Sequence, residues 1–159
     1  MKYRTGIGYD VHQLRDGLPF YLGGVKVEHT KGAVGHSDAD VLIHAVCDAL
    51  LGAANLGDIG KHFPDTDVKY KGIDSKILLK ETYELVKKKG YVIENIDTVL
   101  CLQKPKVAPY LPLMKTTLSN VLGINEDDIS IKATTTEHLG FEGREEGVSA
   151  LANVLIKKE

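Results

Sequence analysis

Two places in the sequence carry side chains that could bind one metal ion together. Asp10 and His12 are two residues apart in a segment with strand character, and alternate residues of a strand point to the same side. His44 lies in an apolar segment. Two imidazoles, one carboxylate and one open position form a ligand set typical of catalytic zinc. Asp-x-His alone is a weak signal, because isolated histidines are more often surface or core residues without a metal.

A helical stripe joins His44 to two carboxylates. Asp40, His44 and Asp48 follow one another at steps of four residues, so they lie on one side of a helix, while the apolar residues between them face the core. We expect Asp48 to orient a metal-bound histidine without binding the ion itself.

Four further segments carry groups suited to a phosphorylated ligand. His36 and Ser37 stand at the expected start of a helix, where unpaired N–H groups favour an anion. Lys104 to Lys106 offer cations after a strand, and Thr134 to Glu137 combine hydroxyls with a carboxylate for a divalent cation. The loop 57–67 could hold sugar hydroxyls. Capping, solvation, strand propensity and Asx turns would explain each segment alone, but together they favour phosphoryl chemistry over hydride or acyl transfer.

The composition predicts one globular domain that spans residues 1–159. This length and 43% hydrophobic residues suffice for a core without disulfides. The formal charge of -2 argues against a nucleic-acid partner. The first ten residues lack the apolar stretch of a signal peptide, and the most apolar segment, 41–54, is too short to span a bilayer. We therefore expect a cytoplasmic protein without a membrane partner.

Strand and helix signals alternate along the chain, which predicts an α+β or α/β sandwich with helices on one face. Gly23-Gly24 predicts a hairpin within 18–28. The segment 148–156 fits either a helix or a strand. The remaining elements are expected as strands at 2–9, 91–103 and 129–135, and as helices at 37–54, 75–89 and 113–122.

Six motifs stand in a fixed order along the chain. They are Gly8 to His12, Gly35 to Val41, Asp48 to Ala53, Gly57 to Gly60, Phe63 to Asp67 and Lys132 to Glu137. In this order and spacing they closely resemble the 2-C-methyl-D-erythritol 2,4-cyclodiphosphate synthase family. The resemblance extends from Gly6 to the C-terminus.

The resemblance implies an enzyme of the non-mevalonate route to isoprenoid precursors. Such a lyase converts 4-diphosphocytidyl-2-C-methyl-D-erythritol 2-phosphate into the 2,4-cyclodiphosphate and CMP, by attack of the 2-phosphate on the β-phosphorus. The implied fold is an α+β ferredoxin-like sandwich with a four-stranded main sheet, helices on one face and a small hairpin. The implied assembly is a homotrimer with active sites between subunits, which makes 148–156 a strand.

The resemblance also implies roles for individual residues. His36 and Thr135 would stabilise the transition state, and Glu137 would bind a magnesium or manganese ion that bridges the α- and β-phosphates. The implied zinc ligands are Asp10, His12 and His44. The implied substrate contacts are His36 and Ser37; Asp58, Ile59, Gly60, Phe63, Pro64, Asp65, Thr66 and Asp67 around the methylerythritol unit; Leu102, Gln103, Lys104, Pro105, Lys106, Val107, Ala108, Thr134, Thr135, Thr136 and Glu137 around the cytidine diphosphate; and Phe141 and Arg144.

Some members of the family hold an isoprenoid diphosphate in an apolar cavity on the trimer axis. Arg144 is kept here, but Tyr9 replaces a phenylalanine and Leu151 replaces a frequent glutamate. These departures argue against a bound isoprenoid diphosphate in this chain.

Two other functions fit parts of the pattern. A zinc phosphohydrolase would use a metal-bound hydroxide and add water to its product, whereas the synthase adds none. A trimeric binding module would hold a structural zinc ion closed by a fourth protein ligand. Asp48 is the residue that would have to serve as that ligand.

Overall fold

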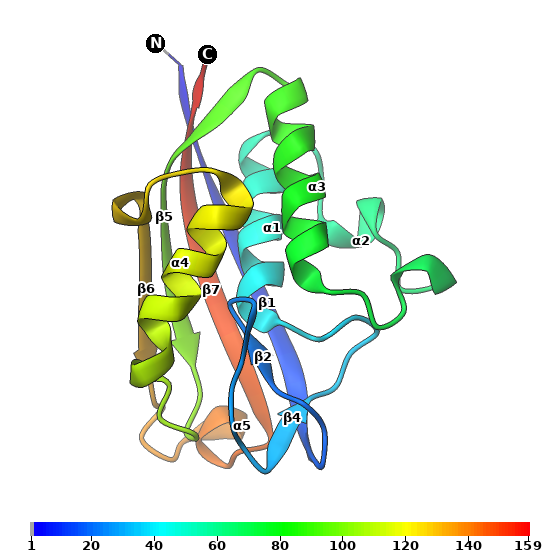
Figure 1. Ribbon diagram of the computed structural model, residues 1–159, viewed down its shortest axis with the longest axis vertical. Helices are drawn as coiled ribbons and strands as arrows, with labels where there is room; N and C mark the ends of the chain where they lie inside the picture. Colours follow the sequence, from blue (N-terminus) through cyan, green and yellow to red (C-terminus); the bar gives the residue numbers. More distant parts are fainter. Residues whose placement is uncertain (1) are drawn as a thin grey trace.

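The computed structural model describes residues 2–159 (Figure 1). The strands are β1 (Tyr3–Asp16), β2 (Tyr21–Leu22), β3 (Val25–Lys26), β4 (Lys31–Ala33), β5 (Tyr91–Cys101), β6 (Ile129–Thr134) and β7 (Gly147–Lys158). The α-helices are α1 (Val41–Ala53), α2 (Ile59–His62), α3 (Ser75–Lys88), α4 (Leu111–Leu122) and α5 (Gly140–Gly143). Short 3-10 helices cover Val68–Tyr70, Ala108–Tyr110 and Glu126–Asp128.

One mixed sheet of five strands, in the order β4-β1-β7-β5-β6, forms the base of the molecule. The pairs β1–β7 and β5–β7 are antiparallel, and β5–β6 is parallel with α4 as its crossover. The helices α1, α3 and α4 cover the same face of this sheet, while β2 and β3 form a separate hairpin (Figure 1). Within residues 2–159, no helix is long and apolar enough to cross a membrane.

The helix α1 lies directly on β1 because two glycines of the strand leave room for it. A Cβ atom on Gly8 would lie 1.9 Å from the Ala45 carbonyl oxygen, and one on Gly6 would lie 2.0 Å from that of Ala49. Both alanines are fully buried. This close approach brings the first turn of α1, which carries His44, against the part of β1 that follows Gly8.

The N-terminus of α1 is fixed by Asp40, whose side chain is fully buried. Its Oδ1 accepts hydrogen bonds from the N–H groups of Gly23 and Ile43, and its Oδ2 accepts one from Gly24 N–H. Burial raises the pKa of Asp40, although these donors favour the charged form. The carboxylate therefore ties the β2–β3 turn to the start of the helix.

The face of the sheet away from the helices carries large apolar side chains. On β1 these are Ile7, which is 67% exposed, Tyr9 and Val11, and Leu151 on β7 is also exposed. Tyr9 pairs directly with Leu151 across the two strands. In the single chain this face has no covering layer among residues 2–159 (Figure 1).

The coarse prediction of an α+β sandwich with helices on one face is confirmed, and so are the hairpin and the strand at 148–156. The four-strand prediction was wrong because Lys31–Ala33 pairs with the end of β1 and adds a fifth strand. A ferredoxin-like chain runs β-α-β-β-α-β, whereas α4 here joins the parallel strands β5 and β6 before β7.

Candidate active site

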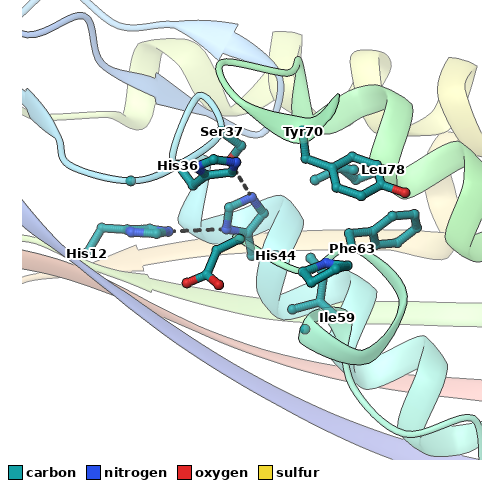
Figure 2. A pocket seen from close by; sticks show the side chains of 12 residues that line it. His12, His36, Ser37, His44, Ile59, Phe63, Tyr70 and Leu78 are labelled. Atoms are coloured by element: carbon teal, nitrogen blue, oxygen red, sulfur yellow. Dashed lines mark hydrogen bonds between the residues drawn. The ribbon is translucent and has the colours of Figure 1, made fainter. Parts of the chain in front are cut away.

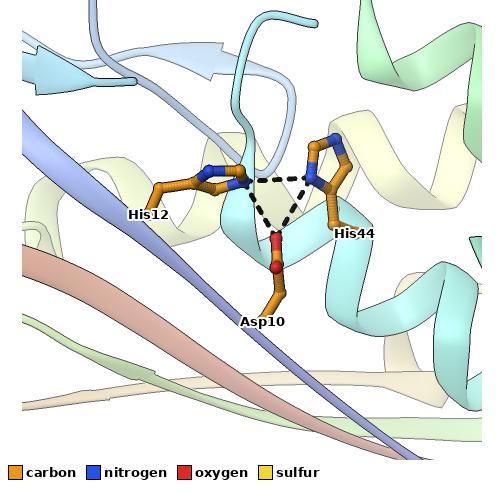
Figure 3. A group of neighbouring side chains, drawn as sticks. All are labelled: Asp10, His12 and His44. Carbon is orange, nitrogen blue, oxygen red and sulfur yellow. Dashed lines mark hydrogen bonds and ion pairs between the residues drawn. The ribbon is translucent and has the colours of Figure 1, made fainter. Parts of the chain in front are cut away.

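Asp10, His12 and His44 come together on the helix-covered face of the sheet (Figure 3). The Asp10 Oδ2 atom lies 2.9 Å from His12 Nε2 and 3.1 Å from His44 Nδ1, and the two ring nitrogens are 3.1 Å apart. Zinc–ligand bonds of about 2.0–2.1 Å in a tetrahedral site place neighbouring ligand atoms about 3.3 Å apart. The triangle of ligand atoms therefore has nearly the size that a zinc ion requires.

Hydrogen bonds behind the two rings determine which nitrogen of each ring faces this triangle. His12 Nδ1 donates to the Val34 carbonyl oxygen at 3.0 Å, which leaves the Nε2 lone pair free. His44 Nε2 lies 2.8 Å from Ser75 Oγ, so its Nδ1 lone pair faces Asp10. Lone pairs of Asp10 Oδ2, His12 Nε2 and His44 Nδ1 therefore point toward one another, and this arrangement suits a cation.

The charges of this cluster are strongly coupled. Burial acts to raise the pKa of Asp10, but hydrogen bonds and charge interactions with His12 and His44 outweigh it and lower the value to about 2. Burial acts to lower the pKa of His12, and the hydrogen bond and charge of Asp10 raise it overall. A proton on His12 and a metal ion at the cluster would compete for the same ring nitrogen.

A cavity of about 440 Å³ opens beside the metal-ligand cluster (Figure 2). Its polar end is formed by the two ligating histidines, and an apolar wall formed by Ile59, Phe63, Tyr70 and Leu78 lies opposite. Phe63 and Tyr70 pack edge to face with ring centroids 5.5 Å apart. Of the predicted site residues, those that line this cavity are His12, His36, Ser37, His44, Ile59, Gly60, Phe63, Pro64 and Asp65.

Two residues of this wall, Tyr70 and Leu78, were not among the predicted site residues, and some predicted residues lie outside the lining. Asp58 and Asp67 do not line the cavity; their side chains cap α2 and the 3-10 helix at 68–70. Thr66 is exposed nearby. Tyr70 ends a 3-10 helix of three residues, which is too short to give a periodic pattern, so no sequence signal pointed to it.

The sequence predicted that His36 and Ser37 stand at a helix N-terminus, but in the structure they precede the helix. The helix α1 begins at Val41, because Asp40 and not Ser37 is its cap, and Ala39 has a positive φ of 57°. Instead, His36 is fastened to the loop across the cavity: its ring Nε2 lies 3.1 Å from the Asp67 carbonyl oxygen.

The prediction that Asp48 orients a ligating histidine is corrected by its contacts. Asp48 Oδ1 accepts a hydrogen bond of 2.7 Å from Ile59 N–H, so the side chain anchors the start of α2. Among residues 2–159, the groups behind the ligating rings are Val34 O for His12 and the hydroxyls of Ser75 and Ser37 for His44.

A second, smaller cavity of about 170 Å³ lies at the ends of β5 and β6. Gln103 is tied to the following turn, because its Oε1 accepts a hydrogen bond from His138 N–H. The predicted cytidine diphosphate contacts that line this cavity are Leu102, Gln103, Pro105, Lys106, Val107, Ala108, Thr134 and Thr135. Lys104 pairs with Glu145, Arg144 pairs with Glu146, and Thr136, Glu137 and Phe141 lie outside the lining.

The two cavities are not joined within one chain. Asp10 pairs with Ala150, Ala150 with Leu100, and Leu100 with Ala133, which precedes the threonine run. Three steps between strands amount to about 14 Å. The Asp10–His12–His44 cluster and the threonine run therefore belong to separate cavities of one chain, which share no lining residue.

Comparison with known proteins identifies the class to which this fold and site belong. The YgbB family model matches residues 3–157, so the chain belongs to the YgbB family. Proteins named 2-C-methyl-D-erythritol 2,4-cyclodiphosphate synthase from Bacteroides thetaiotaomicron and Bacteroides fragilis are 62% and 61% identical to it. The first alignment covers 100% of both chains, and the second covers 99% of both.

Solved structures agree with this assignment. The bifunctional IspDF of Campylobacter jejuni matches with a TM-score of 0.96 at 44% identity; 99% of this chain is covered, but only 43% of that longer one. IspF of Plasmodium falciparum, in a CDP complex, matches with a TM-score of 0.87 at 34% identity over 99% and 97% of the two chains. The family resemblance, the synthase function and the lyase class predicted from the motifs are thereby confirmed.

Proposed function

We propose that the chain cyclises 4-diphosphocytidyl-2-C-methyl-D-erythritol 2-phosphate at sites shared between two copies of a homotrimer. One copy supplies the Asp10–His12–His44 cluster and its cavity, and a neighbouring copy supplies the threonine run and Glu137. The observation that carries the proposal is that the cluster lies on β1 and the threonine run follows β6, three strand spacings or about 14 Å away across the sheet of one chain. The uncovered apolar face around Tyr9 and Leu151 offers a surface for the association.

The donor atoms of this chain suit the metals that the reaction needs. When bound, zinc at Asp10, His12 and His44 supplies a Lewis acid for the diphosphate, and magnesium or manganese at Glu137 supplies positive charge for the CMP leaving group. The convergence of three electron-pair donors in a volume of the right size supports the first assignment.

The protein contributes positioning and charge stabilisation rather than a nucleophile. The substrate's own 2-phosphate forms the new P–O bond to the β-phosphorus while the bond to CMP breaks, so atoms balance without water. His36 and Thr135 hydrogen-bond the phosphoryl oxygens as charge develops on them. Neither cysteine competes for this role: burial raises the pKa of Cys47 to about 12 and also raises that of Cys101.

The apolar wall of the larger cavity favours cyclisation over hydrolysis. Phe63, Tyr70 and Leu78 surround the space in which the methylerythritol unit would lie. Apolar side chains offer no hydrogen bonds to water on this side of the β-phosphorus, which favours attack by the tethered 2-phosphate. The loop that carries this wall is held by the contact of Asp67 O with His36.

Mixing two inactive variants tests the shared site. His44→Ala removes one half and Glu137→Gln the other, and each homotrimer should lose turnover. Chains unfolded, mixed in equal amounts and refolded should recover about a quarter of the original activity, because a quarter of randomly paired half-sites are intact. Phosphorus NMR should show the cyclic diphosphate with equimolar CMP.

Two results would contradict the proposal. Mixed chains that stay inactive, although each variant forms trimers, would place both halves in one chain. An open-chain product together with CMP would instead favour a zinc phosphohydrolase, which the same spectra distinguish.

A further inference from the structure

The ring of His44 is held on its far side by a buried serine. Ser75, the first residue of α3, has no exposed surface, and its Oγ lies 2.8 Å from His44 Nε2. This nitrogen is the one that points away from Asp10 and His12. Ser75 belongs to none of the motifs that carry the family resemblance.

Asp38 fixes the direction of this contact. Its Oδ1 accepts a hydrogen bond from Ser75 Oγ, and its Oδ2 accepts one of 2.9 Å from Ser75 N–H. Asp38 is itself held by its own N–H, which donates to the Ile73 carbonyl oxygen. An ionised carboxylate accepts only, so the serine proton points to Asp38 and the serine lone pairs face His44.

The tautomer of His44 follows from this order of donors. Because Ser75 Oγ offers lone pairs to the ring, His44 Nε2 must carry the hydrogen and Nδ1 must keep its lone pair. Ser37 Oγ, at 3.2 Å from Nε2, already accepts from Ala39 N–H and is the more distant partner. The free lone pair on Nδ1 is the group that the proposed metal needs.

We propose that Asp38 and Ser75 are positioning residues that hold His44 in its metal-binding tautomer and rotation. The carboxylate acts on the imidazole through the serine hydroxyl, and this makes the ring a stronger ligand. The inference rests on the proposed metal site at Asp10, His12 and His44, and it adds two residues that touch neither metal nor substrate.

Zinc affinity, measured on the trimer with a chromophoric chelator as competitor, tests this role directly. Ser75→Ala should weaken zinc binding about 10- to 100-fold. Ser75→Thr keeps the hydroxyl and should recover most of the affinity. Ser119→Ala is a matched control, because Ser119 is also a buried serine whose Oγ donates to a single carbonyl, that of Ile124, but it lies on α4. It should leave the affinity unchanged.

Two further measurements separate positioning from general stability. The absorption bands of the cobalt(II)-loaded protein should shift in Ser75→Ala and in Asp38→Asn but not in Ser119→Ala, because only the first two alter a ligand. Thermal unfolding of the metal-free proteins measures the structural cost of each change. If Ser75→Ala does not fold, Asp38→Asn, which keeps one acceptor oxygen, tests the same positioning role.

The outcomes distinguish this inference from the proposed function. Loss of zinc in His44→Ala with unchanged affinity and spectra in Ser75→Ala and Asp38→Asn would overturn the positioning role and leave the metal site intact. No zinc binding by the unchanged protein would overturn both. Weakened zinc binding in Ser75→Ala with altered cobalt bands, at an unchanged metal-free unfolding temperature, is the result we expect.

Discussion

The two faces of the sheet differ in packing along the same strand: one is covered closely by α1 and the other is exposed. On β1, Gly6 and Gly8 lie under α1 so closely that neither has room for a Cβ, whereas Ile7 and Tyr9, which each follow one of these glycines, point to the uncovered face and are 67% and 56% exposed. His12 continues the glycine row. The covered face therefore holds the core and the metal ligands of one chain, and the open face is the one left for association.

This difference explains why one strand can serve both purposes. Residues alternate in direction along a strand, so the row that meets the helix and the row that meets a partner are interleaved and can be changed separately. Substitutions in one row should affect the folding of the single chain, and those in the other should affect the assembly.

The largest effect is expected for Gly8→Ala on the covered face. The new methyl group would lie 1.9 Å from the Ala45 carbonyl oxygen, which is backbone and cannot rotate away. We expect a loss of about 3 kcal/mol or more in the free energy of unfolding, measured by urea titration, because α1 must move off the strand.

Gly52→Ala is the matched control for this change. Gly52 lies in α1, and its Cβ would come no closer than 4.0 Å to the Ile7 carbonyl oxygen. Alanine favours a helix over glycine by up to about 1 kcal/mol, so stability should stay equal or rise. Equal losses in both variants would contradict the close approach of α1 and β1.

The next largest effect is expected for Tyr9→Lys on the open face. A charged side chain in the centre of the apolar surface should shift the mass in solution from that of the proposed homotrimer toward that of one chain, measured by sedimentation equilibrium. The far-UV circular dichroism should change little, because no element of the single chain packs there. Activity should fall with the trimer.

Ile77→Lys controls for the added charge. Ile77 is 47% exposed on α3, in the helix layer, so the substitution changes an apolar surface residue without touching the open face. Its mass should match that of the unchanged protein. A trimer that survives Tyr9→Lys would show that association uses another surface.

The sequence was sufficient to predict most elements of the fold but not how they are joined. The Gly23-Gly24 hairpin and the helix at 75–89 agree with the structure to within a residue or two at the helix ends. The start of α1 was placed too early, because Ser37 and Asp40 are both good caps and only the contacts of Asp40 with the hairpin decide between them. The short strand at 31–33 has too few residues to give a pattern.

The strand spacing of Asp10 and His12 and the family resemblance predicted the cluster with His44, which could hold a metal ion, whereas no pattern in the sequence pointed to the residue behind the His44 ring. Asp10 and His12 share a strand, and His44 follows from the helix that covers it. Ser75 reaches His44 from 31 residues away, and no periodicity in the sequence relates them. Asp48 has the helical spacing of such a partner but bonds to Ile59 instead.

A smaller effect on stability is expected from the titration of His12 and Asp10 on the covered face. The raised pKa of His12 in the metal-free protein gives stability that is complete below the unfolded value of 6.5 and is lost as the pH rises through the folded value. The pKa of Asp10, lowered to about 2, gives stability that is lost only at strongly acid pH. The metal-free protein should therefore unfold at a lower temperature at pH 8 than at pH 6.

His12→Ala should remove this difference. His29, whose pKa is lowered by burial, acts in the opposite direction and is present in both proteins, so the comparison cancels it. Zinc at the proposed site would reverse the trend, because protons and the metal would compete for the same atoms and acidification would release the ion. Equal pH dependence in the two metal-free proteins would contradict the Asp10–His12 interaction.

The smallest effect is expected for the ion pair on the open face. Lys132 Nζ donates to Asp97 Oδ1, and this hydrogen bond lowers the pKa of Asp97, so its contribution is present above about pH 4 and is lost on acidification. Both side chains are about half exposed in the single chain, and exposed pairs contribute roughly 0.2–1 kcal/mol. Lys132→Ala should cost no more than that in urea unfolding at pH 7, and progressively less as the pH falls below about 4. A loss well above 1 kcal/mol, confined to the trimeric protein, would mean that a neighbouring copy buries this pair, and the open face would then extend across β5 and β6 to the edge of the second half-site.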